Sequence, residues 1–265
     1  MKIFDIHAHI FPDAVAQQMT ANIEAFYTPY VLKPHGDGTL ADCIRQMDAA
    51  DTTKFAVNQV ALRPHASAKI NAFILAAHRS CPERIVPLAS IHPEQKAVND
   101  YVLQAKAAGF AGFKIHPDMQ RFQLDGDAAM PMLRAIAAAG MPVLVHCGDR
   151  RFDFDGPRRV AGLHACLPEL RAIYAHLGGW TQLDEAARLL ADSGALFDLS
   201  GVLGELEPQR AAALIRAYGC KNVLYGSDYP MYAPAEELAR FLRLPLTSQE
   251  REDILWNNAA RLGLV

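Results

Sequence analysis

Short runs of apolar and β-branched residues recur along the chain and alternate with longer, mixed segments. The eight runs fall at residues 2–10, 55–62, 84–93, 111–117, 141–148, 171–179, 195–201 and 222–230. After a long first connection, the strand-to-strand period is about 24 to 31 residues, which is too long for hairpins and typical of units in which a helix follows each strand. The pattern therefore predicts eight parallel strands separated by helices.

Helical periodicity is clearest in residues 181–194. Apolar residues there lie at positions i, i+3, i+4 and i+7, namely Leu183, Ala186, Ala187 and Leu190. Thr181 and Asp184 stand at the spacing of a capping box and predict the start of a helix, and Gly194 predicts its end. The segment is therefore predicted to be an amphipathic helix that follows the sixth strand.

Eight such units within 265 residues, of which 51% are hydrophobic, are enough for one large domain with a buried core. The sequence predicts an α/β fold, a single-domain (β/α)8 TIM barrel spanning residues 1–265. An open, doubly wound sheet is the alternative, but no Gly-x-Gly-x-x-Gly follows the first strand. Two predicted helices at 234–244 and 247–264 close the outer ring, and a capping box of Thr247 and Glu250 opens the second.

The first run carries two histidines. If it is a strand, alternation places Asp5, His7 and His9 on one face. The opposite face then carries four apolar residues, Phe4, Ile6, Ala8 and Ile10. Neutral imidazole is the commonest transition-metal ligand, and the i, i+2 spacing sets two rings close together. A single buried histidine is more often a hydrogen-bonded core residue, so the motif alone leaves both interpretations open.

Three later runs end in residues of the same chemistry, His146, His176 and Asp228. In the sixth run, alternation predicts that Tyr174 and His176 face the barrel interior. The other residues there are predicted to face the helices: Ile173, Ala175 and Leu177. The downstream strand ends of a barrel converge on one rim, where active sites are built. With the two histidines of the first run, these side chains form a ligand set typical of a catalytic zinc-type site, the alternative being that each makes hydrogen bonds to a neighbouring loop.

Four basic side chains near these positions are candidates for substrate binding. Lys114 and His116 share the inward face of the fourth run, which places a buried cation beside the expected metal. Lys114 can bridge ligands, anchor a substrate or form a structural ion pair. Arg150 and Arg151 follow the fifth run and suit bidentate pairing with a substrate carboxylate, whereas a solvated surface loop is the alternative.

The long connection between the first two runs, residues 11–54, is expected to fold over the rim as a lid. It contains the segment AFYTPYVLKPHGDG, in which no motif indicates a substrate. His92 and Asp198, in the third and seventh runs, are further candidates for the pocket wall.

Composition narrows the choice of partner. A net charge of -3 and a pI near 6.4 provide no basic surface for nucleic acid, so the expected partner is a small molecule. The apolar runs are far shorter than the roughly 18 residues of a membrane span, and the N-terminal run lacks the pattern of a signal peptide. We therefore expect a cytoplasmic protein whose five widely spaced cysteines are reduced thiols. Assembly into homo-oligomers stays open.

The order of these residues, together with the local sequences HAHIFP, GFKIHP, VHCGD, AHLGG, GSDYP and NNAARL, resembles the amidohydrolase superfamily. These local sequences are similar to those of its amidohydrolase-related branch, which also contains aminocarboxymuconate-semialdehyde and resorcylate-type decarboxylases. The resemblance covers essentially the whole chain. It implies one divalent metal ion, zinc in the first instance, held by His7, His9, His146 and Asp228. It also implies that His176 acts beside the metal on the substrate or its water.

Three functions follow from this resemblance. The first is a hydrolase that attacks a small amide, ester or lactone, by preference an anionic one, through a metal-activated water, with Asp228 and His176 as catalytic residues. The second is a metal-dependent, non-oxidative decarboxylase of an aromatic or muconate-like acid. The third is a barrel that binds a metal or ligand without turnover.

The number of metal ions is a separate question. One ion is favoured over two, because His116 would crowd a carboxylated Lys114 that bridges a pair of ions.

Overall fold

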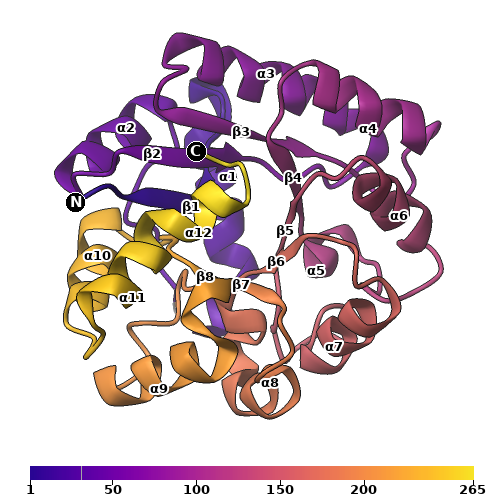
Figure 1. Ribbon diagram of the computed structural model, residues 1–265. Helices are drawn as coiled ribbons and strands as arrows, with labels where there is room; N and C mark the ends of the chain where they lie inside the picture. The colour runs from indigo at the N-terminus through magenta and orange to yellow at the C-terminus, as the bar shows by residue number, and fades with distance from the viewer. Residues whose placement is uncertain (31) are drawn as a thin grey trace.

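The computed structural model describes residues 1–30 and 32–265, and it confirms the predicted barrel (Figure 1). Eight parallel strands follow one another around the ring in chain order. They are β1 (Phe4–His9), β2 (Lys54–Asn58), β3 (Ile85–Ser90), β4 (Gly112–Ile115), β5 (Val143–Val145), β6 (Ala172–Tyr174), β7 (Leu196–Asp198) and β8 (Val223–Leu224). Backbone contacts between β1 and the chain after β8, including a parallel bridge between Ala8 and Tyr229, close the ring.

Helices surround the ring on its outside (Figure 1). The α-helices are α1 (Asp13–Phe26), α2 (Leu40–Ala49), α3 (Ser67–Ser80), α4 (Val98–Ala107), α5 (Pro117–Gln120), α6 (Met130–Ala138), α7 (Pro157–Cys166), α8 (Leu183–Leu190), α9 (Pro208–Tyr218), α10 (Pro234–Leu242), α11 (Ser248–Glu252) and α12 (Asn258–Arg261). The shorter turns are η1 (Thr28–Tyr30), η2 (Pro64–Ala66), η3 (His176–Gly178), η4 (Trp180–Gln182), η5 (Cys220–Asn222) and the π-helical η6 (Asp253–Asn257). No helix among the described residues is long and apolar enough to cross a membrane.

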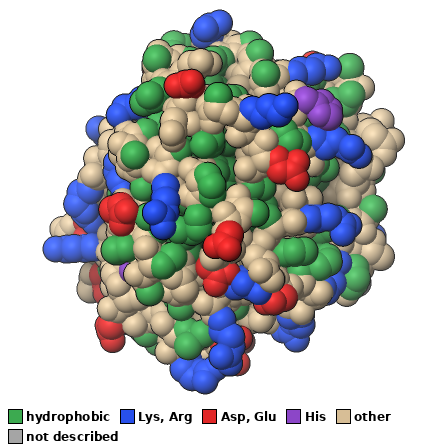
Figure 2. All heavy atoms as spheres, turned by 90° about the vertical axis from the view of Figure 1, so that its right-hand side faces the viewer, with side chains coloured by type: hydrophobic (Ala, Val, Ile, Leu, Met, Phe, Trp, Pro, Cys, Tyr) green, Lys and Arg blue, Asp and Glu red, His purple; other side chains and the backbone are tan. Residues whose placement is uncertain are grey.

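Figure 2 shows the face that carries α4, α6 and α7 in Figure 1. Basic and acidic side chains are interspersed across this face, with apolar side chains between them. The mixture agrees with the small net charge of -3 for the whole chain.

Of the two predicted capping boxes, one is formed and the other is not. The capping box of Thr247 and Glu250 is present at the start of α11, as predicted. The one predicted at Thr181 is not formed, because α8 begins at Leu183 without a side-chain cap. The Thr181 hydroxyl instead donates to the carbonyl oxygen of Gly148 at 2.8 Å. The Thr181 hydroxyl, which was predicted to cap the helix, is therefore hydrogen-bonded to the loop after β5 instead.

The predicted end of the same helix is also displaced. Helix α8 ends at Leu190, before Gly194 is reached. The chain already adopts a left-handed conformation at Asp192, where φ is 57°. Gly194, with a φ of 76°, serves the turn that leads into β7. The glycine therefore marks a turn between helix and strand.

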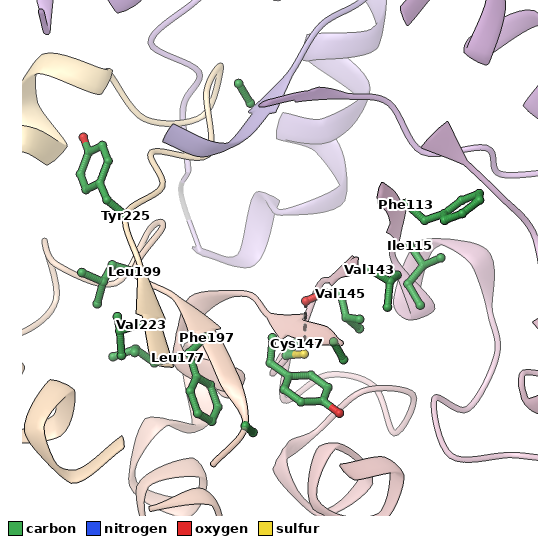
Figure 3. Close-up of a cluster of buried hydrophobic side chains, with 14 of the residues drawn as sticks. Phe113, Ile115, Val143, Val145, Cys147, Leu177, Phe197, Leu199, Val223 and Tyr225 are labelled. Carbon is green, nitrogen blue, oxygen red and sulfur yellow. Dashed lines mark hydrogen bonds between the residues drawn. The ribbon is translucent and has the colours of Figure 1, made fainter. Parts of the chain in front are cut away.

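Two apolar layers hold the barrel together. One lies inside the ring, where residues from most strands meet one another, and Ala259 and Leu264 close it at the end where α12 lies. Its strand-borne members are Phe4, Ile6, Ala56, Val86, Leu88, Leu144, Ile173 and Leu224, with Ala175 directly after β6. The other layer lies between strands and helices, and Figure 3 shows Phe113, Val143 and Phe197 among its members. Burial of these two layers is the main force that holds the strand ends in place.

The alternation predicted for β6 is wrong. Ile173 and Ala175 belong to the interior layer, whereas Tyr174 belongs to the outer layer. His176 nevertheless faces the interior, because the chain leaves the strand conformation there. The φ angle is 57° at His176 and 53° at Leu177, so a left-handed turn carries the imidazole to the side that Tyr174 does not face.

Strand β1 contains a bulge. Its register against β2 shifts between Asp5 and Ala8, where β1 has one residue more than its partner. As a result, Ile6 and His7 both face the interior. A Cβ atom on Gly226 would lie 3.2 Å from Ile6 Cγ2 and 3.1 Å from His7 Cβ, so both side chains pack closely against this glycine.

The bulge separates Asp5 from the two histidines, contrary to the predicted alternation. His7 and His9 share the interior face, but Asp5 lies on the other side of the strand. Its Oδ1 accepts from the backbone N–H groups of His7 and Ser227, each at 3.0 Å, and its Oδ2 has no partner among the described residues. Burial raises the pKa of Asp5 to about 7.

This buried proton predicts a pH dependence of stability. The folded state keeps a proton on Asp5 that the unfolded chain releases, so the protein should lose stability as the pH rises from about 4 to 7. Asp5→Asn removes this loss and retains an oxygen for the two backbone donors. Relative to the wild type, the variant's free energy of unfolding should therefore increase across this range, by at most about 4 kcal/mol.

Urea titrations at several pH values measure this effect. Asp127→Asn, which replaces an exposed carboxylate, is the control and should follow the wild type. An Asp5→Asn curve that runs parallel to that of the wild type would show that Asp5 carries no such proton.

Candidate active site

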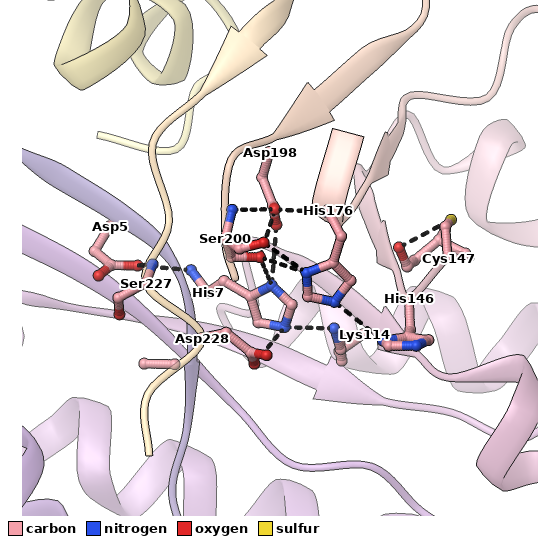
Figure 4. A network of polar contacts seen from close by, with 12 residues as sticks. Asp5, His7, Lys114, His146, Cys147, His176, Asp198, Ser200, Ser227 and Asp228 are labelled. Carbon is pink, nitrogen blue, oxygen red and sulfur yellow. Dashed lines mark hydrogen bonds and ion pairs between the residues drawn. The ribbon is translucent and has the colours of Figure 1, made fainter. Parts of the chain in front are cut away.

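Three side chains from β1 and the loop after β8 meet at the rim. The Nε2 atoms of His7 and His9 lie 3.2 Å apart, and each lies 3.3 Å from Oδ1 of Asp228. The backbone N–H of Asp228 donates to the carbonyl oxygen of His7 at 2.8 Å, which holds the two segments together. Figure 4 shows the Asp228 carboxylate directed at the His7 ring. Three of the four predicted metal ligands therefore lie together.

Asp198 fixes the position of the proton on His7. Its Oδ2 lies 3.0 Å from His7 Nδ1, and the Ser200 hydroxyl oxygen lies 2.9 Å from the same nitrogen. A carboxylate only accepts, so Nδ1 carries the hydrogen and Nε2 keeps its lone pair toward the cluster. Burial, assisted by the charge of Lys114, lowers the pKa of His7 to about 4, so the ring is neutral.

The His7–His9–Asp228 cluster fits a divalent metal ion. Burial alone would raise the pKa of Asp228, but the two histidines hold it below its ordinary value, so the carboxylate is charged. Separations of 3.2 to 3.3 Å match neighbouring ligand atoms that are each about 2.0–2.2 Å from one ion. Two imidazoles and one carboxylate also leave coordination positions for water or substrate.

Lys114, on β4, lies directly beside this cluster. It is fully buried, and its Nζ is 2.7 Å from His7 Nε2 (Figure 4). Burial lowers the pKa of Lys114 to about 8. The ammonium and a metal ion would compete for the same lone pair on His7. Lys114 is not among the residues that line the cavity, so its role in substrate binding stays a prediction.

His176 and His146 form a second row beside the cluster (Figure 4). His176 Nδ1 lies 2.8 Å from the carbonyl oxygen of Ser200, and its Nε2 lies 3.1 Å from His146 Nδ1. Because a carbonyl only accepts, His176 carries a hydrogen on Nδ1, and with an unprotonated Nε2 it accepts from His146 Nδ1. His146 Nε2 then faces away, toward Asp118 at 3.8 Å. The place of His146 as the fourth ligand stays a prediction.

His146 belongs to a second group with His116, Asp118 and Asp155. One potential ligand atom from each residue lies within 4.8 Å of the others, and all four residues are buried. The rings of His116 and His146 are stacked, with centroids 3.7 Å apart. Burial raises the pKa of Asp118 to about 7 and raises that of Asp155 well above its ordinary value.

Sequence reasoning missed four residues of this region, namely Tyr27, Asp118, Asp155 and Ser200. Asp118 directly follows the motif GFKIHP, and Ser200 lies two positions after Asp198, so closeness to motif residues was an available signal. Nothing in the local sequence reveals the burial of Asp155. Tyr27 comes from the lid, and its hydroxyl lies 2.9 Å from His116 Nε2.

A cavity of about 340 Å³ opens above both groups. Its polar end is formed by His9, His116, Asp118, His146 and Asp228. The remaining lining is mainly apolar and aromatic: Phe11, Met19, Ile23, Phe26, Tyr27, Val60, Leu62, Met119, Phe152, Phe154 and Met231, with Asn22 and Arg121. Helix α1 and the residue after it supply five of these residues, so the segment 11–54 covers the rim as predicted. Val31, within that segment, lies outside the described residues.

The comparison with known proteins decides the family. A family model described as amidohydrolase matches residues 4–262. This chain belongs to the amidohydrolase family. The match confirms the resemblance that the sequence motifs predicted, and it spans both the β1 histidines and Asp228. No curated protein sequence matches the chain.

Several solved structures share the fold of this chain at low sequence identity. An uncharacterized TIM-barrel protein from Bordetella bronchiseptica is 19% identical, with a TM-score of 0.76 over 99% of this chain and 98% of its own. A dihydroxybenzoic acid decarboxylase from Polaromonas sp. JS666, with bound manganese and 2-nitroresorcinol, is 15% identical, with a TM-score of 0.74 over 98% and 96%. A probable 2-pyrone-4,6-dicarboxylic acid hydrolase from Acinetobacter baumannii, with citric acid bound, is 19% identical, with a TM-score of 0.71 over 99% and 98%.

Arg150 and Arg151, the two arginines predicted to bind substrate, are absent from the described lining of the cavity. Arg151 pairs with Asp149, its Nε lying 3.0 Å from each carboxylate oxygen, and its Nη1 donates to the carbonyl oxygen of Phe26 at 2.7 Å. Its guanidinium also lies 4.9 to 5.7 Å from the ring centroids of Phe26, Tyr27, Tyr30 and Phe152. Arg151 therefore fastens the end of the lid helix to the loop after β5.

Two other predicted positions are also accounted for. Arg150 is exposed, bonds to Thr181 and lines a neighbouring groove of about 700 Å³. His92 is buried, and its Nδ1 accepts from the backbone N–H of Glu94 at 3.2 Å, outside the described cavity lining. The roles of both arginines in substrate binding stay predictions.

Removal of the Arg151 side chain, which fastens α1 to the loop after β5, should loosen the lid. We expect Arg151→Ala to lower the free energy of unfolding by about 1–3 kcal/mol and to speed amide hydrogen exchange in residues 13–30. Arg158→Ala, which breaks an exposed ion pair with Glu185, is the control and should leave that exchange unchanged. Unaltered exchange in both variants would show that Arg151 does not fasten the lid.

Asp198 should control metal affinity without binding the metal. His7→Ala removes a ligand and should empty the site, whereas Asp198→Asn should weaken binding by about 10- to 100-fold, because the amide no longer secures the hydrogen on His7 Nδ1. Titration with zinc and elemental analysis measure both effects. Glu237→Gln changes another buried carboxyl, on α10, and should bind as the wild type does. Full metal occupancy in His7→Ala would exclude this cluster as the site.

Proposed function

We propose that this protein is a metal-dependent hydrolase of a small ester, lactone or amide with a compact apolar body. The observation that supports it best is the His7–His9–Asp228 cluster at the polar end of the cavity. A divalent ion such as zinc, held by these three residues, would act as a Lewis acid and would supply a nucleophilic water at neutral pH. His146 is the fourth ligand in this proposal, by the family resemblance.

The proton transfers are assigned to two residues of the chain. Asp228 is ionised and therefore able to take a proton and pass it to the leaving group. His176 stands beside the cluster, with ring centroids 5.4 Å from those of His7. Its Nδ1 is held by the carbonyl oxygen of Ser200, and its Nε2 lies 3.1 Å from His146 Nδ1, so proton exchange with the substrate through Nε2 requires the contact with His146 to open.

The cavity indicates what kind of substrate enters. The carbonyl or anionic group of the substrate fits the polar end, near His9, His116 and Asp228, while the body lies among aromatic walls. Arg121 is the one Lys or Arg among the described lining residues. A substrate with a single anionic group at the metal end therefore suits the cavity better than one that carries several carboxylates.

Decarboxylation is the second candidate, and the aromatic walls favour it. The rings of Phe26 and Phe152 are stacked with centroids 5.6 Å apart at the cavity wall, and an aromatic acid would lie well beside them. The similar Polaromonas structure holds manganese and an aromatic inhibitor, which supports the same use of this site. Here His176 would deliver a proton to the ring carbon that loses carbon dioxide.

One assay separates these functions. The protein, loaded with zinc or manganese, is screened against carboxylated lactones, aryl esters and amides, and hydroxybenzoates in ¹⁸O-labelled water. Label in the product acid supports hydrolysis. Release of carbon dioxide, with no label in the remaining organic product, supports decarboxylation. Stoichiometric metal binding without turnover of any of these compounds would favour a binding protein instead.

His176→Asn tests the acid–base assignment. We expect turnover to fall by about 10²-fold or more while the metal stays bound, because the amide cannot exchange a proton. His92→Asn is a matched control, since His92 is also buried but its Nδ1 accepts from the backbone N–H of Glu94 instead of contacting a histidine of the site. Loss of metal together with activity in His176→Asn would make His176 a ligand.

A further inference from the structure

We propose that Tyr27, at the end of the lid helix, binds the substrate. Its hydroxyl donates a hydrogen bond to an acceptor oxygen of the carbonyl or carboxylate group that lies at the polar end of the cavity. This role rests on the proposed function in one respect, namely that the oxygen-bearing group of the substrate enters that end. It does not depend on whether hydrolysis or decarboxylation follows.

Tyr27 is held where the lid meets the polar end of the cavity. It directly follows α1, it is 6% exposed, and it belongs to the cavity lining. Arg151 Nη1 donates to the carbonyl oxygen of the preceding residue, Phe26, at 2.7 Å. The Tyr27 ring packs edge-on against Trp180, with centroids 5.1 Å apart, and its hydroxyl oxygen lies 2.9 Å from His116 Nε2. Contacts on both sides of the ring therefore fix the place of the hydroxyl.

The backbone fixes the tautomer of His116. This residue is the N-cap of α5, and its Nδ1 accepts from the backbone N–H of Met119 at 3.4 Å. A ring nitrogen that accepts carries no hydrogen, and every imidazole carries at least one, so the hydrogen of His116 is on Nε2. His116 therefore donates from Nε2 to the hydroxyl oxygen of Tyr27.

This donation leaves the hydroxyl hydrogen of Tyr27 available. The hydroxyl accepts from His116, and no other hydrogen bond of its oxygen is found among the described residues. Burial, assisted by nearby carboxylates, raises the pKa of Tyr27 well above its ordinary value, so the hydroxyl keeps its hydrogen. A buried donor requires an acceptor. An oxygen of the substrate at the polar end supplies one.

The donor distinguishes substrates by the oxygen that they carry. A hydroxyl that donates to a carboxylate forms a charge-assisted hydrogen bond, which is stronger than a bond to a neutral acceptor. Benzoate and nitrobenzene are a matched pair of probes for this difference, because a nitro group has nearly the shape of a carboxylate but no net charge. Their common ring suits the cavity wall at Phe26 and Phe152.

Calorimetric titration of zinc-loaded protein with these two probes tests the role of Tyr27. Tyr27→Phe keeps the ring and removes only the hydroxyl. We expect it to weaken the binding of benzoate by about 10-fold and to change that of nitrobenzene by less than about 2-fold. Tyr101→Phe is the control, since the Tyr101 hydroxyl donates to the carbonyl oxygen of Ser90 outside the described cavity lining, and it should bind both probes as the wild type does.

Two results of this titration would overturn the role. Equal weakening of both probes in Tyr27→Phe would show a loss of packing and not of a hydrogen bond. Unchanged binding of benzoate in the variant, or no binding of benzoate to the wild type, would show that Tyr27 donates to no carboxylate.

The tautomer of His116 is a second, independent measurement. Nitrogen NMR of metal-free protein labelled with ¹⁵N-histidine reports which ring nitrogen carries the hydrogen, and the loss of signals in His116→Gln assigns the ring. We expect the hydrogen on Nε2. A hydrogen on Nδ1 would make Tyr27 the donor to His116, would leave no hydrogen for a substrate and would overturn the role.

Neither measurement involves turnover, so the role of Tyr27 and the proposed function fail separately. Weaker benzoate binding in Tyr27→Phe, together with no turnover of any compound in the screen, supports the role of Tyr27 and contradicts the hydrolase. Hydrolysis in the screen with the same kcat and KM in Tyr27→Phe as in the wild type supports the hydrolase and contradicts the role of Tyr27.

Discussion

The Asp198 carboxylate is the interaction on which the rest of the site depends. Its Oδ2 faces His7 Nδ1, and its Oδ1 accepts from the backbone N–H groups of His176 and Ser200 and from the Ser200 hydroxyl. One buried group thus sets the tautomer of His7, a proposed metal ligand on β1, and the position of His176 after β6. Because these donors outweigh the cost of burial, the pKa of Asp198 stays below its ordinary value. The acidic end of β7 therefore organises chemistry that takes place on other strands.

Burial keeps the imidazoles of the site neutral. The pKa values of His9, His116 and His146 are all lowered, chiefly by burial, with Lys114 adding to the effect for each. Neutral rings retain lone pairs, and lone pairs are what a metal ion requires. The apolar side chains that form the cavity walls therefore also lower the pKa of the histidines at its polar end.

Much of the fold could be predicted from the sequence, because strand runs and helix stripes are local patterns. The same holds for His7, His9 and Asp228, since parallel strand ends converge wherever a barrel forms. His176 faces the interior as predicted, but the reason could not be predicted, because a left-handed turn and not alternation directs its side chain. The contacts of Arg151 could not be predicted either, because its partners include Phe26 of the lid, which is far away in the sequence.

The bulge in β1 has a further consequence. Because Ile6 and His7 both face inward, the change from an oily interior to an ionic one occurs across a single peptide unit. Gly226 lies against both side chains. A methyl group at this position would press on Ile6, in the interior apolar layer, and on His7, a proposed metal ligand, at once. The interior apolar layer and the proposed metal site therefore meet at Gly226. A substitution at this glycine would disturb both of them at once.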